Sequence, residues 1–182
     1  MARIEIHDES SGQAEGKTRR WTLHLPPLEA ALVDGLPDRL ERLLGNPGDN
    51  RRVIDRLFPQ SYSDPEEERE HRRLLGSSLL AERREMLKLV RRSLRAGKRL
   101  ARDQGERMQA LAMRLDTGTL DLWLRFLNDL RLILATELGV DENIGSKQIE
   151  PDDPDAPRYT LLVYLGGLEA LLVEAAIGDP GF

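Results

Sequence analysis

Alternating apolar and polar positions near the N-terminus predict a β-hairpin, because successive side chains of a strand point to opposite faces. The glycine-containing connector ESSGQAEGK separates the two alternating segments, 3–8 and 18–25,. Two strands alone are marginally stable, so the hairpin must pack on helices. The apolar positions are Ile4 and Ile6 in the first segment and Trp21, Leu23 and Leu25 in the second.

Helical spacing of apolar residues dominates the rest of the chain. Pro26 and Pro27 favour a helix start, and Pro37 predicts a kink in that helix or the start of a second one. Asp64 is the clearest helix cap, because its carboxylate can accept hydrogen bonds from the first free amides. Gly97 and Gly105 mark two breaks in helical character. Helices are expected at about residues 26–44, 51–58, 64–95 or beyond, 116–138 and 159–177, with a loop at 45–50.

The last predicted helix is apolar on nearly every side, so we expect it at the centre of a helical bundle,. It contains Glu169 and Glu174, whose charges are costly in lipid, and this favours a core helix over a membrane span. Residues 1–182 are therefore predicted to form one mainly α domain. It consists of a helical bundle, 26–177, with the small β-hairpin, 1–25, packed on it.

Composition narrows the possible functions. The chain has no cysteine, which excludes a thiol nucleophile, a cysteine-based zinc site and a thiol redox sensor within it. Its histidines, His7, His24 and His71, form no metal-binding motif, and the two in the hairpin are expected on its polar face. We expect no catalytic site, no metal and no cofactor, and an enzyme with carboxylates in a helical cleft is the least favoured alternative. The N-terminus lacks a signal-peptide pattern, which favours a cytoplasmic protein without membrane contact.

The strongest local feature is a concentration of positive charge in a chain whose net charge is −5. Residues 83–102 contain nine Arg or Lys and one Glu. On a helix, most of these cations fall within an arc of about 120°, and Met86, Leu89, Val90 and Leu100 lie on the other side. We call this arc the basic stripe, and it consists of Arg84, Lys88, Arg91, Arg92, Arg95, Lys98, Arg99 and Arg102.

The sequence leaves three interpretations of the basic stripe open. The favoured one is a solvated or internally paired face, with the acidic loop at 150–155 as one source of partners. The second is a docking face for an acidic protein. The third is sequence-independent binding of nucleic acid through phosphates. No aromatic residue interleaves the cations, so stacking on bases is not indicated.

Polar residues also interrupt the apolar helix at 116–138, namely Asn128, Asp129 and Arg131. Arg131 lies four residues after Leu127 and three before Leu134, so we expect it to be partly buried. A buried arginine that has a partner usually has a structural role, and we favour that role here.

Several segments together resemble a bacterial family long known as a domain of unknown function and named after the AosR oxidative stress regulator of actinobacteria. The segments are LPPLEAALVDGLPDRLERLL, RLFPQSYSDPEEEREHRRL, LDLWLRFLNDLRLILATELGV and YLGGLEALLVEAAI. The resemblance covers residues 21–177, and the order and spacing of the segments make it specific. Its motif residues are Arg56, Phe58, Pro59, Tyr62, Trp123, Asp129 and Arg131.

The resemblance implies a helical cytoplasmic protein that controls transcription through contacts with other proteins and responds to oxidants through a cysteine pair. The thiol switch cannot be carried over, because this chain has no cysteine. The motif residues are interpreted as scaffold, with Tyr62 and Arg131 as candidates for lining a partner groove. We expect a non-enzymatic regulatory or adaptor protein that binds another protein, such as a transcription factor. Binding of nucleic acid is the alternative, and the sequence does not indicate an oligomeric state.

Overall fold

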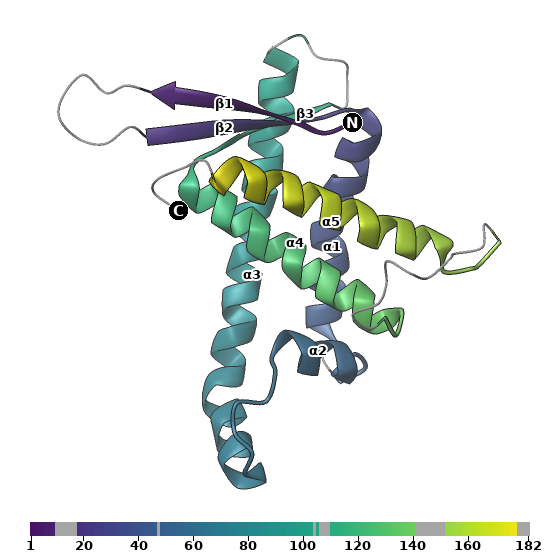
Figure 1. Ribbon diagram of the computed structural model, residues 1–182. Coiled ribbons are helices and arrows are strands. Elements are labelled where there is room, and N and C mark those ends of the chain that lie inside the picture. Colours follow the sequence, from purple (N-terminus) through teal and green to yellow (C-terminus); the bar gives the residue numbers. More distant parts are fainter. Residues whose placement is uncertain (10–17, 47, 104, 106–109, 141–151, 178–182) are drawn as a thin grey trace.

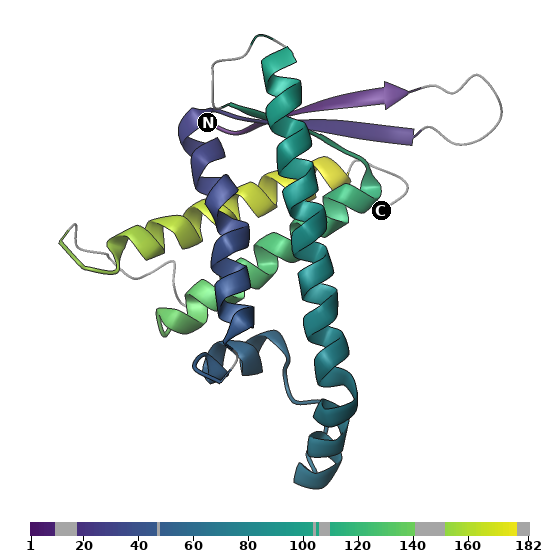
Figure 2. The ribbon, with the colours of Figure 1, turned by 180° about the vertical axis from the view of Figure 1, so that it is seen from behind.

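The computed structural model describes residues 1–9, 18–46, 48–103, 105, 110–140 and 152–177. A long helix, α3, runs the length of the molecule with α1 beside it (Figure 1). The pair α4 and α5 crosses both helices, in front of them in Figure 1 and behind them in Figure 2. A small sheet covers one end. In chain order the elements are β1 (Arg3–Glu9), β2 (Thr18–Leu25), α1 (Pro27–Gly45), α2 (Arg51–Leu57), α3 (Pro65–Asp103), β3 (Leu111–Leu115), α4 (Thr117–Glu137) and α5 (Ala156–Ile177).

The predicted mainly α fold with an N-terminal hairpin is confirmed, and the hairpin is part of a larger sheet. β1 pairs antiparallel with β2, and Ile6 lies opposite Trp21. The strand β3 then pairs antiparallel with the other edge of β2, where Leu23 lies opposite Met113. The sequence pattern does not predict β3, because LAMRL is a short apolar run without clear alternation. Only pairing with a strand about 90 residues earlier makes it a strand.

The expectation that His24 lies on a polar face of the hairpin was wrong, because the third strand changes its environment. With β3 present, β2 is the central strand, and residues on both of its faces are buried. Thr22 is 5 % exposed and His24 is 7 % exposed, although both lie on the face that we expected to be polar. The His24 imidazole lies 3.4 Å from the Glu5 carboxylate, and His7 contacts the Thr22 hydroxyl at 3.0 Å.

The predicted helix boundaries agree closely with the structure. The Asp64 carboxylate accepts hydrogen bonds from the amides of Glu66 and Glu67 at 2.7 and 3.1 Å, which confirms it as a cap. Gly139 has a positive φ of 61° and ends α4, as its position predicted,. Pro37 is buried inside the single helix α1. Gly97, expected as a break, lies inside α3, which continues to Asp103.

The central helix is α4, so the expectation that the last helix is central was wrong. α4 contacts α2, α3, α5 and β3, and its Trp123, Phe126 and Leu130 are fully buried. α5 packs on α4 and β1 but leaves Val163 66 % and Ile177 79 % exposed. By length and composition alone α5 could cross a membrane, yet one of its faces is buried. The apolar composition of a helix does not specify which of its faces are covered by neighbouring elements.

Two indole hydrogen bonds connect these layers. Trp21 of β2 donates to the carbonyl oxygen of Ala175 in α5 at 3.1 Å. Trp123 of α4 donates to the Ser93 hydroxyl of α3, also at 3.1 Å. One continuous buried cluster contains residues from the sheet and from every one of these helices, so α3, β3 and α4 are held in fixed relative positions.

Candidate docking groove

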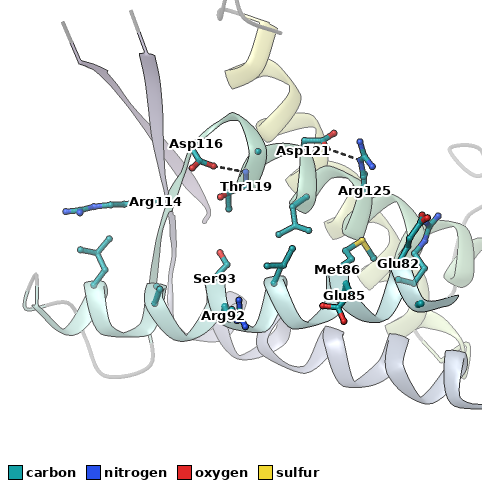
Figure 3. A pocket seen from close by; sticks show the side chains of 18 of the residues that line it. Glu82, Glu85, Met86, Arg92, Ser93, Arg114, Asp116, Thr119, Asp121 and Arg125 are labelled. Atoms are coloured by element: carbon teal, nitrogen blue, oxygen red, sulfur yellow. Dashed lines mark hydrogen bonds and ion pairs between the residues drawn. The ribbon is translucent and has the colours of Figure 1, made fainter. Parts of the chain in front are cut away.

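A groove of about 1120 Å³ lies where α3, β3 and the first half of α4 meet (Figure 3). α3 forms one wall, and β3 with the N-terminal turns of α4 forms the other. The lining residues are Ser78, Ala81, Glu82, Arg83, Glu85, Met86, Leu89, Arg92, Ser93, Ala96, Gly97 and Leu100 from α3, Ala112 and Arg114 from β3, and Asp116, Gly118, Thr119, Asp121, Leu122 and Arg125 from the segment that begins α4.

The floor of the groove is largely apolar and partly open to solvent. Met86 and Val90 on the apolar side of α3 are buried, but Leu89 is 46 % exposed and lines the groove. Leu122 of α4 is half-buried on the facing wall. α3 is too long for its neighbours to cover its whole apolar side, so part of that side becomes the groove.

Three carboxylates of the groove, those of Asp116, Asp121 and Glu85, have local structural roles. Asp116 caps α4, because its carboxylate accepts a hydrogen bond from the Thr119 amide at 2.8 Å. Hydrogen bonds from Thr119 hold the pKa of Asp116 below its usual range,. Asp121 pairs with Arg125 at 3.0 Å, and Glu85 pairs with Lys88 at 2.6 Å. No histidine lines the groove, and the described residues contain no cluster of three or more His, Asp or Glu suited to a metal.

Two arginines at the groove are available to a partner. Arg92 of α3 and Arg114 of β3 are both exposed lining residues. Within the described ranges, neither side chain has an acidic partner. In Figure 3, Arg114 lies toward one end of the groove and Arg92 lies near the middle, beside Ser93.

Some cations of the basic stripe form ion pairs with α1, and the others are exposed to solvent. Arg91 lies 2.6 Å from Asp38 and 2.7 Å from Glu41 on α1, and these carboxylates raise its pKa, Glu41 more strongly. Lys98 lies 2.7 Å from Asp34 of the same helix. The acidic partners therefore come from α1. In the expected loop at 150–155, residues 150 and 151 lie outside the described residues, and Asp155 pairs with Arg158 of α5.

The rest of the stripe points to solvent. Lys88 pairs with its neighbour Glu85 on the same helix, and the guanidinium groups of Arg95 and Arg102 donate to backbone carbonyls one turn earlier. Around α3, the paired cations face α1, whereas Arg92 faces the groove. The exposed members are Arg84, Lys88, Arg92, Arg95, Arg99 and Arg102.

One end of the groove contains a buried ion pair that the sequence analysis did not find. Arg83 Nε lies 2.6 Å from Asp129 Oδ2, and its guanidinium lies over the Phe58 ring at 5.4 Å. Asp129 is 4 % exposed. Burial raises its pKa, and the Arg83 charge opposes that rise,. Arg83 thus contacts two motif residues, Asp129 of α4 and Phe58 at the end of α2. Only the fold shows that Arg83 lies near them.

The chain connection that contains the motif residues Phe58, Pro59 and Tyr62 is held in place by Glu68. The Glu68 carboxylate accepts hydrogen bonds from the amides of Ser61 and Tyr62 at 3.0 and 3.1 Å and pairs with Arg72 at 2.6 Å. The hydrogen bond from Arg72 is the main cause of a lowered pKa at Glu68. These contacts fix the Phe58 to Asp64 connection. Arg56 and Pro59 at its start are exposed.

Neither candidate for lining a partner groove lies in this one. Tyr62 is 44 % exposed and packs edge-to-face on His71, with ring centroids 5.2 Å apart. Arg131 pairs with Glu169 of α5. The family resemblance marked both residues, but it could not place them relative to the groove.

The comparison with protein families covers nearly the whole chain. A family model described as a domain of unknown function, DUF2017, matches residues 10–176. The chain belongs to the DUF2017 family. No curated protein and no solved structure matches it. The resemblance to a family of unknown function is thereby confirmed, whereas nothing in the comparisons links this DUF2017 protein to AosR or to oxidative stress.

Proposed function

We propose that this DUF2017 protein is a non-enzymatic regulatory or adaptor protein that binds another protein in the groove between α3 and α4. The observation that carries the proposal is an apolar floor that is exposed at Leu89 and surrounded by charges of both signs. Exposed apolar surface with a polar rim is typical of sites where proteins bind one another.

The size of the groove supports a macromolecular partner. Pockets for small molecules usually measure about 300–1000 Å³ and enclose most of the ligand. This groove is larger, at about 1120 Å³, and it extends over much of one helix. The carboxylates of Asp116, Glu85 and Asp121 are used as a cap or in local ion pairs, so they do not favour an acid–base mechanism.

The proposal includes a role in bacterial transcription or stress response in the cytoplasm. This role rests on the resemblance of the motif segments to the AosR-like family. Because the chain has no cysteine, partner binding in this protein does not depend on a thiol switch of its own. Binding of nucleic acid is the second candidate function, and the exposed arginines of the basic stripe, such as Arg95 and Arg99, favour it,.

Affinity capture from host lysate, with and without nuclease, tests the proposal. The groove variant Leu89→Glu, Ala96→Glu places charges on two exposed lining positions. The control variant Leu74→Glu, Ala170→Glu makes the same residue changes at exposed positions outside the groove. We expect a nuclease-resistant protein partner that the groove variant loses and the control keeps.

Two results would contradict the proposal. If the groove variant captures the same protein as the wild type, the groove is not the docking site. If nuclease removes everything captured, and Arg95→Glu, Arg99→Glu does the same, the protein binds nucleic acid through the basic stripe.

A further inference from the structure

The shape of the groove suits a helix. Its α3 wall runs from Ser78 to Leu100, a length of about 33 Å at the helical rise of 1.5 Å per residue. Along this wall the lining residues recur every three or four positions, for example at Leu89, Ser93 and Ala96. Such rows form the ridges and grooves against which a second helix packs.

An extended peptide would find less to bind. A peptide that adds a strand to a sheet is held mainly by backbone hydrogen bonds to an exposed edge. β3 contributes only Ala112 and Arg114 to the lining. Ala112 is fully buried, and its carbonyl oxygen lies close under Gly97 of α3. The accessible wall is therefore a helix and not a strand edge.

The charges of the groove differ between its two ends. Glu82 and Glu85 lie toward the Ser78 end, and Glu85 already pairs with Lys88. In the half of the groove toward Leu100, Arg92 and Arg114 stand on opposite walls. The carboxylates near them are engaged, since Asp116 caps α4 and Asp121 pairs with Arg125. This half of the groove thus presents two cations to anything that lies on the apolar floor.

We propose that the occupant is an amphipathic helix of another protein, whose apolar face covers Leu89 and Leu122 and whose acidic side chains pair with Arg92 and Arg114. This inference rests on the proposed function and adds the chemical class of the partner. The small exposed side chain of Ala96 in this half of the groove allows a close approach of the helix. Opposite charges fix which end of the incoming helix lies there, because reversal would bring acidic groups toward Glu82.

Designed peptides test the inference directly. The probe is a helical peptide of about 20 residues with leucines at every third or fourth position and glutamates beside them, long enough to match the α3 wall. The first control replaces each glutamate with lysine, and the second keeps the composition but scrambles the leucine spacing. A single-stranded oligonucleotide of about 20 nucleotides serves as the nucleic-acid probe. Binding is measured by fluorescence anisotropy at two salt concentrations.

We expect the acidic amphipathic peptide to bind at least about ten times more tightly than either control peptide. Arg92→Glu, Arg114→Glu should weaken its binding by at least about tenfold. Arg52→Glu, Arg84→Glu changes the net charge equally at exposed positions outside the groove, and we expect less than about a twofold effect from it.

The outcomes separate this inference from the proposed function. Equal affinity for the glutamate and lysine peptides would overturn the inference that the partner helix is acidic. Loss of the lysate partner in the Leu89→Glu, Ala96→Glu variant would still support a protein-binding groove. If no helical peptide binds, the occupant is not a helix and the inference is wrong. It is also wrong if the oligonucleotide displaces the acidic peptide and binds more tightly, because the cations then recognise phosphates.

Discussion

At the scale of single residues, the pair of Arg83 and Asp129 shows how charge is held inside this fold. Asp129 is almost completely buried on the central helix α4, whereas Arg83 retains 27 % exposure of its side chain at the edge of the groove. Arg83 also covers the Phe58 ring. Removing a charge from water is costly, and this cost offsets much of the attraction between the two groups. Removal of only one member is the more damaging change, because it leaves the other charge without its counter-charge,.

The sign of the pH dependence follows from the pKa of Asp129. Burial raises this pKa, so the folded protein holds the proton more tightly than the unfolded chain does. Stability from this carboxyl is therefore full below its unfolded pKa and falls as the pH rises through its folded pKa. Loss of Arg83 removes the charge that opposes the rise in the pKa of Asp129. The loss of stability with rising pH therefore becomes larger.

We predict that Arg83→Met destabilises the protein by about 2–3 kcal/mol at pH 7 and by clearly less near pH 4. The double variant Arg83→Met, Asp129→Asn should recover most of the loss at pH 7, because the amide carries no charge to bury. Urea unfolding of both variants and the wild type at the two pH values measures the effect. An equal loss at both pH values would show that Arg83 acts only through packing.

At the scale of elements, the contact between α3 and β3 determines the shape of the groove wall. A Cβ at Gly97 would lie 2.7 Å from Met113 Cγ, 2.8 Å from Leu111 Cδ1 and 3.1 Å from the carbonyl oxygen of Ala112. These distances are too short for a side chain. Gly97 is therefore present because the helix must lie close to the strand, and not because the helix breaks there.

We predict opposite effects of the same substitution at two glycines of α3. Gly97→Ala should destabilise the protein by about 1–3 kcal/mol through overpacking against β3. A Cβ at Gly76 meets nothing within 4 Å, so Gly76→Ala should stabilise it by about 0.5–1 kcal/mol through helix propensity. Urea unfolding measures both variants. Similar stabilities of the two would mean that α3 and β3 separate easily.

At the scale of the whole molecule, the charge distribution decides which part of the basic stripe can bind anything. The acidic residues Asp34, Asp38 and Glu41 of α1 neutralise the side of α3 that faces them. The opposite side of the stripe borders the groove, and the arginines between the two sides face solvent. An acidic protein can therefore present a local basic surface.

We predict that Asp34→Asn, Asp38→Asn, Glu41→Gln strengthens binding of a single-stranded oligonucleotide at low salt, because it frees Arg91 and Lys98 for phosphates. Exposed ion pairs contribute little to stability, so the cost should stay below about 1 kcal/mol for each pair. Titrations over a series of salt concentrations give the number of phosphate contacts from the slope. An unchanged slope would show that the paired cations remain unavailable.

The same variant is informative for the groove. It leaves Arg92 and Arg114 untouched, so affinity for the acidic amphipathic peptide should change by less than about twofold. A large gain in peptide affinity would indicate that an acidic partner lies along the whole stripe and not in the groove.

The sequence by itself determined which segments become helices, because apolar spacing, the Asp64 cap and the Gly139 terminus act locally,. It also determined the hairpin, through alternation about Trp21 and Leu23. Only the tertiary structure made residues 111–115 a strand and buried His24, because pairing between distant segments has no local signal,. It also placed α4, and not α5, at the centre and assembled the groove from Leu89, Arg92 and Arg114, which share no sequence motif. Which neighbours cover an apolar face is settled by packing, and packing depends on the whole chain.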